Sequence, residues 1–330
     1  MREDMKELLN LKAYFSPQHV RAYGEIDSGT NVAHYTTAEA ALSILENQEI
    51  WLRNTVYMND STEMIHGFNQ LDAFFNNHQP STENFELLQE FITTLNLLNE
   101  NLLPLAVKYF DESFPIVREN AYCCSLSLHD AEQDRNGKLS MWRGYGKNQP
   151  AVALIINSSA FLQVTDDYGA YALPVVYGDQ QNFIDGIRES IVSIKQGREW
   201  LEELDIDTLG RALLNSFTAN TIARKHPGFS EELEWRIFHF DKTPLHNRGK
   251  LEKKIVILAG RPQVVMAAPL RNFSAEGIFG TDLNEIINSV IIGPTANPKH
   301  MREVFIEKLN SKGIDNAESR VSVSDIPWRN

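Results

Sequence analysis

Val32-Ala33-His34-Tyr35-Thr36-Thr37 begins a segment, ending at Asn59-Asp60, that predicts a short strand, a helix and a second strand. Thr36 followed by Glu39 has the spacing of a capping box, in which the hydroxyl accepts an N–H of the first turn and the glutamate reaches back. From Glu49 to Arg53 the apolar period falls to two, as in a half-buried strand. Polar groups at a strand end beside a helix N-terminus suit an anionic or polyhydroxy ligand. The segment therefore predicts the start of a sheet and one part of a ligand site.

The composition is that of a globular protein, with 42% hydrophobic and 23% charged residues among 330. The net charge of -13 gives no broad basic footprint for nucleic acid. The adjacent Cys123 and Cys124 are poorly placed to bridge each other, and there is no second pair for a zinc site, so we expect no metal. No apolar run has the length of a signal-peptide core or a membrane span. We therefore expect a cytoplasmic protein that makes no membrane contact.

The organisation along the chain predicts one main domain. Residues 1–31 are expected to form an N-terminal leader, and residues 32–330 a single α/β catalytic-type domain. Between about residues 79 and 114 the sequence is helical and rich in Leu and Phe, without visible site chemistry. We interpret this stretch as a helical insert that packs on the core or on a partner.

A second segment, Leu139–Gly146, places two aromatic residues, an arginine and two glycines just before an apolar strand. Arg143 offers a fork for a phosphate, and Trp142 or Tyr145 offers a face for a flat ring. The alternative is a loop leading into the strand, with Trp142 filling the core.

A third segment follows a Pro-Gly loop and has the period of a strand. That period places Glu232, Glu234 and Arg236 on one face. Two carboxylates and a guanidinium in one row indicate either a site or an exposed sheet edge. A structural ion pair between Glu234 and Arg236 is a further alternative.

Taken together, these segments resemble the motifs of a widespread bacterial family catalogued as a domain of unknown function. The motifs are His34-Tyr35-Thr36 with Asn59-Asp60, then Trp142-Arg143-Gly144-Tyr145-Gly146, then Glu232-Leu233-Glu234-Trp235-Arg236. The resemblance runs from about residue 30 to about residue 295. That family in turn resembles the ADP-ribosyltransferase fold. The resemblance implies an α+β chain with an ADP-ribosyltransferase-like split mixed β-sheet core, a helical insertion and peripheral helices.

In the ADP-ribosyltransferase superfamily an opening strand carries a histidine, a middle segment an aromatic residue or a serine, and a late strand a glutamate. The matching positions here are His34, Tyr145 or Trp142, and Glu234 or Glu232. The resemblance implies a cytoplasmic NAD-dependent ADP-ribosyltransferase or NAD glycohydrolase, plausible as a bacterial defence or toxin effector. NAD is then the substrate, and the acceptor is a protein, a nucleic acid, a small molecule or water.

Cleaving the nicotinamide–ribose bond passes through an oxocarbenium-like centre, which a carboxylate stabilises. We assign that role to Glu234 and the activation of the nucleophile to Glu232. The ribose hydroxyls would bind His34 and Thr36, the ring would stack on an aromatic residue, and the pyrophosphate would pair with an arginine. The residues assigned to NAD binding are His34, Tyr35, Thr36, Asn59, Asp60, Trp142, Arg143, Tyr145 and Arg236.

Two other functions fit the same residues. The first is a catalytically inactive nucleotide-binding or protein-interaction module, in which the helical insert contacts an antitoxin-like partner or a second copy of the chain. The second is hydrolysis by the paired carboxylates, as in a glycosidase or a metal-dependent nuclease. No third metal ligand is in view for the latter, and the acidic charge disfavours long nucleic acids.

Overall fold

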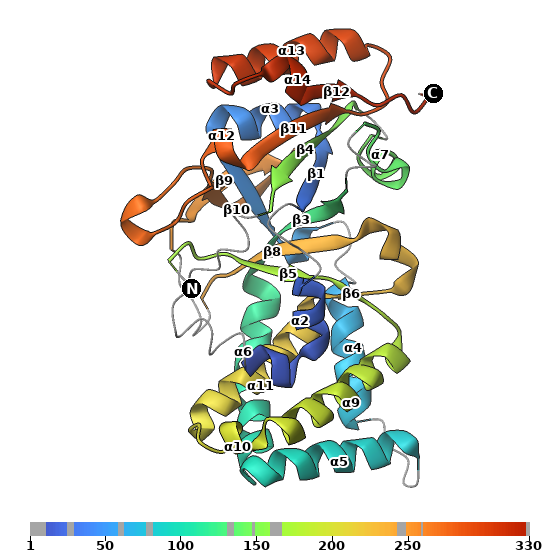
Figure 1. Cartoon of the computed structure of the whole chain (residues 1–330), viewed down its shortest axis with the longest axis vertical. Coiled ribbons are helices and arrows are strands. Elements are labelled where there is room, and N and C mark those ends of the chain that lie inside the picture. Colours follow the sequence, from blue (N-terminus) through green and yellow to red (C-terminus); the bar gives the residue numbers. More distant parts are fainter. Residues whose placement is uncertain are drawn as a thin grey trace.

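A computed structural model describes residues 11–24, 30–58, 63–76, 82–130, 135–146, 149–158, 167–242, 249–258 and 260–327. Its upper part in Figure 1 is a sheet and its lower part a layer of helices. The fold is α+β, as the sequence predicts. The strands of the sheet are β1 (Asn31–Thr37), β2 (Glu49–Asn54), β3 (Ala121–His129), β4 (Ala151–Asn157), β5 (Tyr171–Pro174), β8 (Glu234–Phe240), β9 (Glu252–Leu258), β10 (Arg261–Pro269), β11 (Ile287–Ile292) and β12 (Val321–Val323).

The main path of the sheet runs β12-β11-β4-β1-β3-β2-β10-β9, and β8 joins β3 to β5. Every pairing in this sheet among the described strands is antiparallel except that of β11 with β12. β1 and β2 pair with opposite ends of β3, at Ala33↔Ser127 and Asn54↔Tyr122 respectively. Two further short strands, β6 (Val176–Tyr177) and β7 (Arg224–Lys225), form a parallel pair of their own. The sheet is therefore mixed and mostly antiparallel.

Helices cover the sheet and extend beyond it. Their bounds are α2 (Pro17–Gly24), α3 (Ala38–Asn47), α4 (Glu63–Asn76), α5 (Glu83–Leu98), α6 (Leu102–Asn120), α7 (Leu139–Tyr145), α9 (Gln180–Gln196), α10 (Arg198–Leu201), α11 (Ile206–Ile222), α12 (Leu283–Ile286), α13 (Pro298–Ser311) and α14 (Ala317–Arg320). Short 3-10 turns are η1 (Thr55–Tyr57), η3 (Pro227–Glu232) and η4 (Ser274–Glu276). No helix in the described ranges is both long and apolar enough to cross a bilayer.

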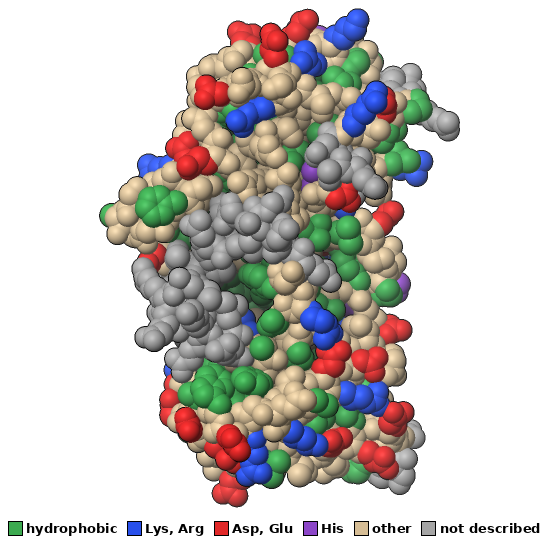
Figure 2. Space-filling view, viewed as in Figure 1, with side chains coloured by type: hydrophobic (Ala, Val, Ile, Leu, Met, Phe, Trp, Pro, Cys, Tyr) green, Lys and Arg blue, Asp and Glu red, His purple; other side chains and the backbone are tan. Residues whose placement is uncertain are grey.

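The buried side chains form two large cores. The first lies on one face of the sheet, where Leu45 of α3 and Phe305 of α13 pack on Leu52 and Leu154 of the strands. The second lies inside the helical layer and is built from α4, α5, α6, α9 and α11. Figure 2 shows acidic and basic side chains interspersed over the face that it draws.

The helical layer draws on more of the chain than the stretch expected at residues 79–114. α5 and α6 cover most of that stretch, but α4 precedes it, and α9 and α11 come from much later in the chain. Leu88 of α5 and Phe183 of α9 share one core. Within the stretch expected to be a leader, Arg21 of α2 forms an ion pair with Glu189 of α9. α2, which lies in this stretch, therefore packs on the helical layer.

The opening strand, helix and strand are present as predicted, but the helix cap is one residue later. Thr37, not Thr36, is the N-cap of α3, and its hydroxyl accepts the N–H of Ala40. Thr36 stays in the sheet because β1 pairs with β4 through Thr36↔Val152 and Thr37↔Ala151. The ladder to β4 thus extends the strand by one residue and moves the start of the helix.

Thr37→Ala is expected to lower the free energy of unfolding by about 1 kcal/mol, because it removes the N-cap acceptor. Thr36→Ala is the matched control and is expected to have a smaller effect. Urea unfolding followed by circular dichroism measures both. Equal losses in the two variants would contradict the assignment of the cap to Thr37.

Candidate ligand-binding site

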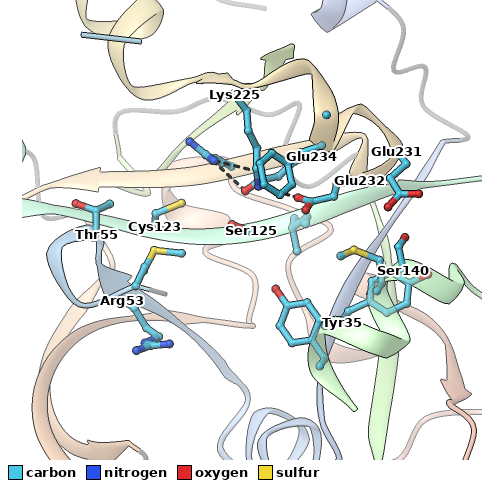
Figure 3. Close-up of a pocket in the computed structure, with 18 of the residues that line it drawn as sticks. Tyr35, Arg53, Thr55, Cys123, Ser125, Ser140, Lys225, Glu231, Glu232 and Glu234 are labelled. Carbon is cyan, nitrogen blue, oxygen red and sulfur yellow. Dashed lines mark hydrogen bonds and ion pairs between the residues drawn. The ribbon is translucent and has the colours of Figure 1, made fainter. Parts of the chain in front are cut away.

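A cavity of about 430 Å³ opens where β2, β3 and β8 meet α7 and η3 (Figure 3). This volume is within the range of small-molecule sites. The polar and aromatic residues that line it are Tyr35, Arg53, Thr55, Ser125, Ser140, Tyr145, Lys225, Phe229, Glu231, Glu232, Glu234, Arg236 and Phe238. They come from every segment singled out in the sequence and from two that were not.

The cavity lies between two small apolar clusters on the sheet face opposite the first core. In one cluster, Trp142 of α7 packs on Tyr35. In the other, Ile222 at the end of α11 packs on Cys123 and Phe238. Since Tyr35, Cys123 and Phe238 all line the cavity, the hollow is the part of the sheet that neither α7 nor the helical layer covers.

Strand register explains which side chains meet there. Arg53 of β2 pairs with Cys123 of β3, and Ser125 of β3 pairs with Arg236 of β8. Cross-strand partners share one face of a sheet, and so do residues two apart on a strand. Arg53, Ser125, Glu234 and Arg236 are therefore presented on one face.

Glu234 is the most tightly held carboxylate of the cavity. Its side chain is only 6% exposed. Arg236 donates to it twice, from Nε to Oε1 at 2.9 Å and from Nη2 to Oε2 at 3.1 Å, and Lys225 Nζ lies 3.2 Å from Oε2. Burial alone raises the pKa of Glu234, but Arg236 and Lys225 together lower it to about 2. The carboxylate is ionised at neutral pH.

Lys225 joins the two glutamates that the sequence placed on one strand face. Its ammonium, on a side chain 7% exposed, lies 2.8 Å from Glu232 Oε2 as well as next to Glu234. The prediction that Glu232 belongs to the strand is wrong, because Glu232 ends η3 and β8 begins at Glu234. Leu233 between them has a φ of 45°, so the chain turns there. The two carboxylates meet through Lys225 rather than through strand alternation.

The middle segment is a short helix, α7, and not the loop that the sequence suggested. Tyr145 at its end lines the cavity, and burial raises the pKa of its phenol to about 12. Trp142 faces the other way: it is 4% exposed, its Nε1 donates to the carbonyl of Asn136 at 2.8 Å, and its ring meets Tyr35 edge-on. Arg143 is exposed and does not line the cavity. Of these three residues, only Tyr145 reaches the site.

The first segment is divided between the two faces of β1. Tyr35 lines the cavity, and its hydroxyl accepts the N–H of Lys138 at 2.9 Å. His34 and Thr36 do not line it. His34 Nδ1 lies 3.2 Å from the carbonyl of Ser125 and 3.7 Å from Sγ of Cys124, which belongs to the first core. Burial lowers the pKa of His34. The imidazole therefore sits on the opposite face of the sheet from Glu234.

Asn59 and Asp60, also assigned to NAD binding, lie outside the described residues. The lining residues that the sequence did not assign to a site include Arg53, Thr55, Ser125 and Lys225. A signal for Arg53 was present, since the period of two in β2 puts it opposite the buried Ile50 and Leu52. Lys225 carried no such signal, because its role depends on the tertiary contacts that bring β7 to Glu232 of η3 and Glu234 of β8.

Comparison with known proteins gives one match. Residues 141–237 match a family described as "Protein of unknown function (DUF2971)". This range covers Tyr145, Lys225, Glu232, Glu234 and Arg236 of the cavity. It is narrower than the range of about 30 to 295 expected from the motifs. No curated protein and no solved structure matches the chain.

Proposed function

We propose that this cavity binds NAD or a related nucleotide and cleaves the nicotinamide–ribose bond, as an ADP-ribosyltransferase or NAD glycohydrolase does. The observation that carries the proposal is the ionised Glu234 in the wall of a cavity that also presents cationic and aromatic side chains. A negative charge held in place without water around it stabilises a positively charged sugar in the transition state. Tyr145 and Phe229 supply ring faces in the same cavity.

The chemistry assigns separate roles to the two glutamates. As the C1′–N bond breaks, nicotinamide leaves with the electron pair, and Glu234 stabilises the charge that develops on the ribose. Glu232 accepts the proton of the attacking nucleophile while that nucleophile bonds to C1′. Glu232 suits this role better than Glu234, because its side chain is 25% exposed and, among the described residues, its carboxylate forms an ion pair with Lys225 alone. His34 has no part in this scheme.

A second candidate function is a nucleotide-binding module without turnover. The observation that favours it is the pairing of Glu234 with both Arg236 and Lys225, which neutralises much of the carboxylate's field. The same fold would then act as a sensor, or as a protein that contacts a partner.

Glu232→Gln is expected to reduce nicotinamide release from NAD by roughly 100-fold or more, because the substitution removes the general base. Stability is expected to change little, since Lys225 keeps Glu234 as its partner. Chromatographic detection of free nicotinamide measures the rate, and thermal unfolding measures stability. Arg143→Ala, at an exposed position outside the cavity, is the control and should keep the wild-type rate.

Three results would contradict the catalytic proposal. Saturable NAD binding by the wild-type protein without any nicotinamide release would establish the binding module instead. Release that persists unchanged in Glu232→Gln would remove the role assigned to that carboxylate. Loss of release on adding EDTA would favour a metal-dependent hydrolase over the reaction proposed here.

A further inference from the structure

Arg53 differs from the other cations that line the cavity. Lys225 and Arg236 are paired with carboxylates, whereas no carboxylate of the described residues forms an ion pair with Arg53. Within the described part of the chain, its Nη2 donates only to neutral oxygens, the carbonyl of Tyr57 at 3.0 Å and Oε1 of Gln263 at 3.3 Å. Its buried Nε has no hydrogen-bond partner in that part. Arg53 thus carries a positive charge at the cavity wall that nothing described in the chain neutralises.

Thr55, two residues after Arg53, also has a polar atom without a partner. Its side chain lines the cavity and is only 7% exposed, yet its hydroxyl has no hydrogen-bond partner among the described residues. Leaving a buried hydroxyl without a partner destabilises the folded state, and native proteins usually avoid it. Figure 3 shows Thr55 and Arg53 on the same side of Glu234, with the guanidinium of Arg53 directed away from the Thr55 side chain. Among the described residues, both therefore carry a donor without a partner at this side of the cavity.

Strand pairing on both sides and two side-chain hydrogen bonds fix the backbone that carries Arg53 and Thr55. Arg53 pairs with Val265 of β10 on one side and with Cys123 of β3 on the other. Between the two residues, the side chain of Asn54 accepts the N–H of Val56 at 2.9 Å and donates to the carbonyl of Glu119 at 2.8 Å. The positions of the two donors are thus set before a ligand arrives, which lowers the entropy lost on binding.

A guanidinium without an acidic partner among the described residues, together with an unused hydroxyl that lines the same cavity, is suited to a phosphate. Arginine donates through a planar fork that matches the oxygens of a phosphoryl group, and a threonine hydroxyl adds one more donor. Apo sites often show such bonds incomplete, and the bonds form when the ligand enters. The arginines assigned to the pyrophosphate from sequence do not serve, because Arg143 lies outside the cavity and Arg236 is engaged by Glu234.

We propose that Arg53 and Thr55 form a phosphate subsite, which binds the phosphates of a nucleotide whose sugar lies at the Glu234 side of the cavity. The inference rests on the proposed function for the identity of the ligand as a nucleotide. The subsite narrows the substrate class to nucleotides and excludes nucleosides, which have no phosphate. It also sets the orientation of the bound ligand, with the phosphates at β2 and the scissile bond at β8.

The test is isothermal titration of the full chain with ADP, adenosine and inorganic pyrophosphate. ADP has no nicotinamide to release, so its binding is independent of turnover. ADP and pyrophosphate are expected to bind, and Arg53→Gln to weaken both roughly 10- to 100-fold, because the bonds lost are charge-assisted. Thr55→Val is expected to weaken both several-fold while leaving the melting temperature equal or higher, since it removes a buried unpaired hydroxyl. Arg143→Gln is the matched control and should bind as the wild type does.

Three outcomes would overturn the subsite. The first is wild-type affinity for ADP in both Arg53→Gln and Thr55→Val, and the second is equal affinity of the wild-type protein for ADP and adenosine. The third is a Thr55→Val variant that loses affinity only in proportion to its loss of stability. None of the three outcomes tests whether Glu232→Gln stops nicotinamide release. Conversely, phosphate-dependent ADP binding in a protein that releases no nicotinamide would support the subsite and contradict the proposed enzyme.

Discussion

Glu234→Gln is expected to lower the free energy of unfolding by about 3–5 kcal/mol and to abolish nicotinamide release. The loss of stability follows from the two buried cations that the substitution leaves behind. Arg236 is 4% exposed and Lys225 7% exposed, and both bond to the carboxylate that the substitution removes. Because one carboxylate pairs with both buried cations, the melting temperature should fall together with the free energy of unfolding.

The pH dependence of unfolding tests the same interaction without a mutation. The pKa of Glu234 is about 2 in the folded protein, against 4.5 for an unperturbed glutamate. The unfolded chain therefore binds the proton more readily, so stability from Glu234 is complete above about pH 4.5 and is lost as pH falls towards 2. The shift corresponds to about 3 kcal/mol at neutral pH. Urea unfolding of wild type and Glu234→Gln between pH 6 and pH 3 should show the two proteins converging as pH falls.

A double variant separates the structural role of Glu234 from the catalytic one. Glu234→Gln combined with Arg236→Met removes the buried charge that the single substitution leaves unpaired, and is expected to recover part of the lost stability. Nicotinamide release should stay absent in the double variant. Recovery of release together with stability would show that Glu234 acts only through the fold. A single variant that keeps wild-type stability would contradict the ion pairing itself.

Trp142→Ala is expected to lower the free energy of unfolding by about 3–5 kcal/mol, as large-to-small changes of buried aromatic residues do. Trp142 is 4% exposed and packs edge-on against Tyr35, with 4.8 Å between the ring centroids. Its ring also contacts Gly293 so closely that a Cβ atom added to this glycine would lie 2.8 Å from the ring. The truncation would leave a cavity beside β1 and remove the bond from Nε1 to the carbonyl of Asn136.

Trp142→Phe is the matched variant, because it keeps a ring in the core and loses mainly the Nε1 hydrogen bond, a loss of about 1–2 kcal/mol. Chemical unfolding of both variants measures the difference. A loss under 1 kcal/mol for Trp142→Ala, combined with weaker nucleotide binding, would contradict the core role and restore the stacking role considered from the sequence.

The sequence determined the local elements and some of the cavity residues in each site segment. The apolar period of two predicted β2 with Ile50 and Leu52 inward, and the buried pattern of the strand is as predicted. The adjacent Cys123 and Cys124 are free, as their spacing indicated. These features depend on residues that are close together in the chain, and a local sequence pattern can predict such features.

Only the tertiary structure decided which strand faces border a hollow. A period of two requires that His34 and Tyr35 point to opposite sides of β1, but it does not say which side stays uncovered. That choice was made by α7 and by the ends of α6 and α11, which pack on the face carrying Tyr35 and Phe238 and leave the cavity between them. The same packing brings Lys225 to Glu234 and leaves Arg53 without an acidic partner among the described residues. Contacts between segments far apart in the chain set these electrostatic environments, and no local pattern encodes them.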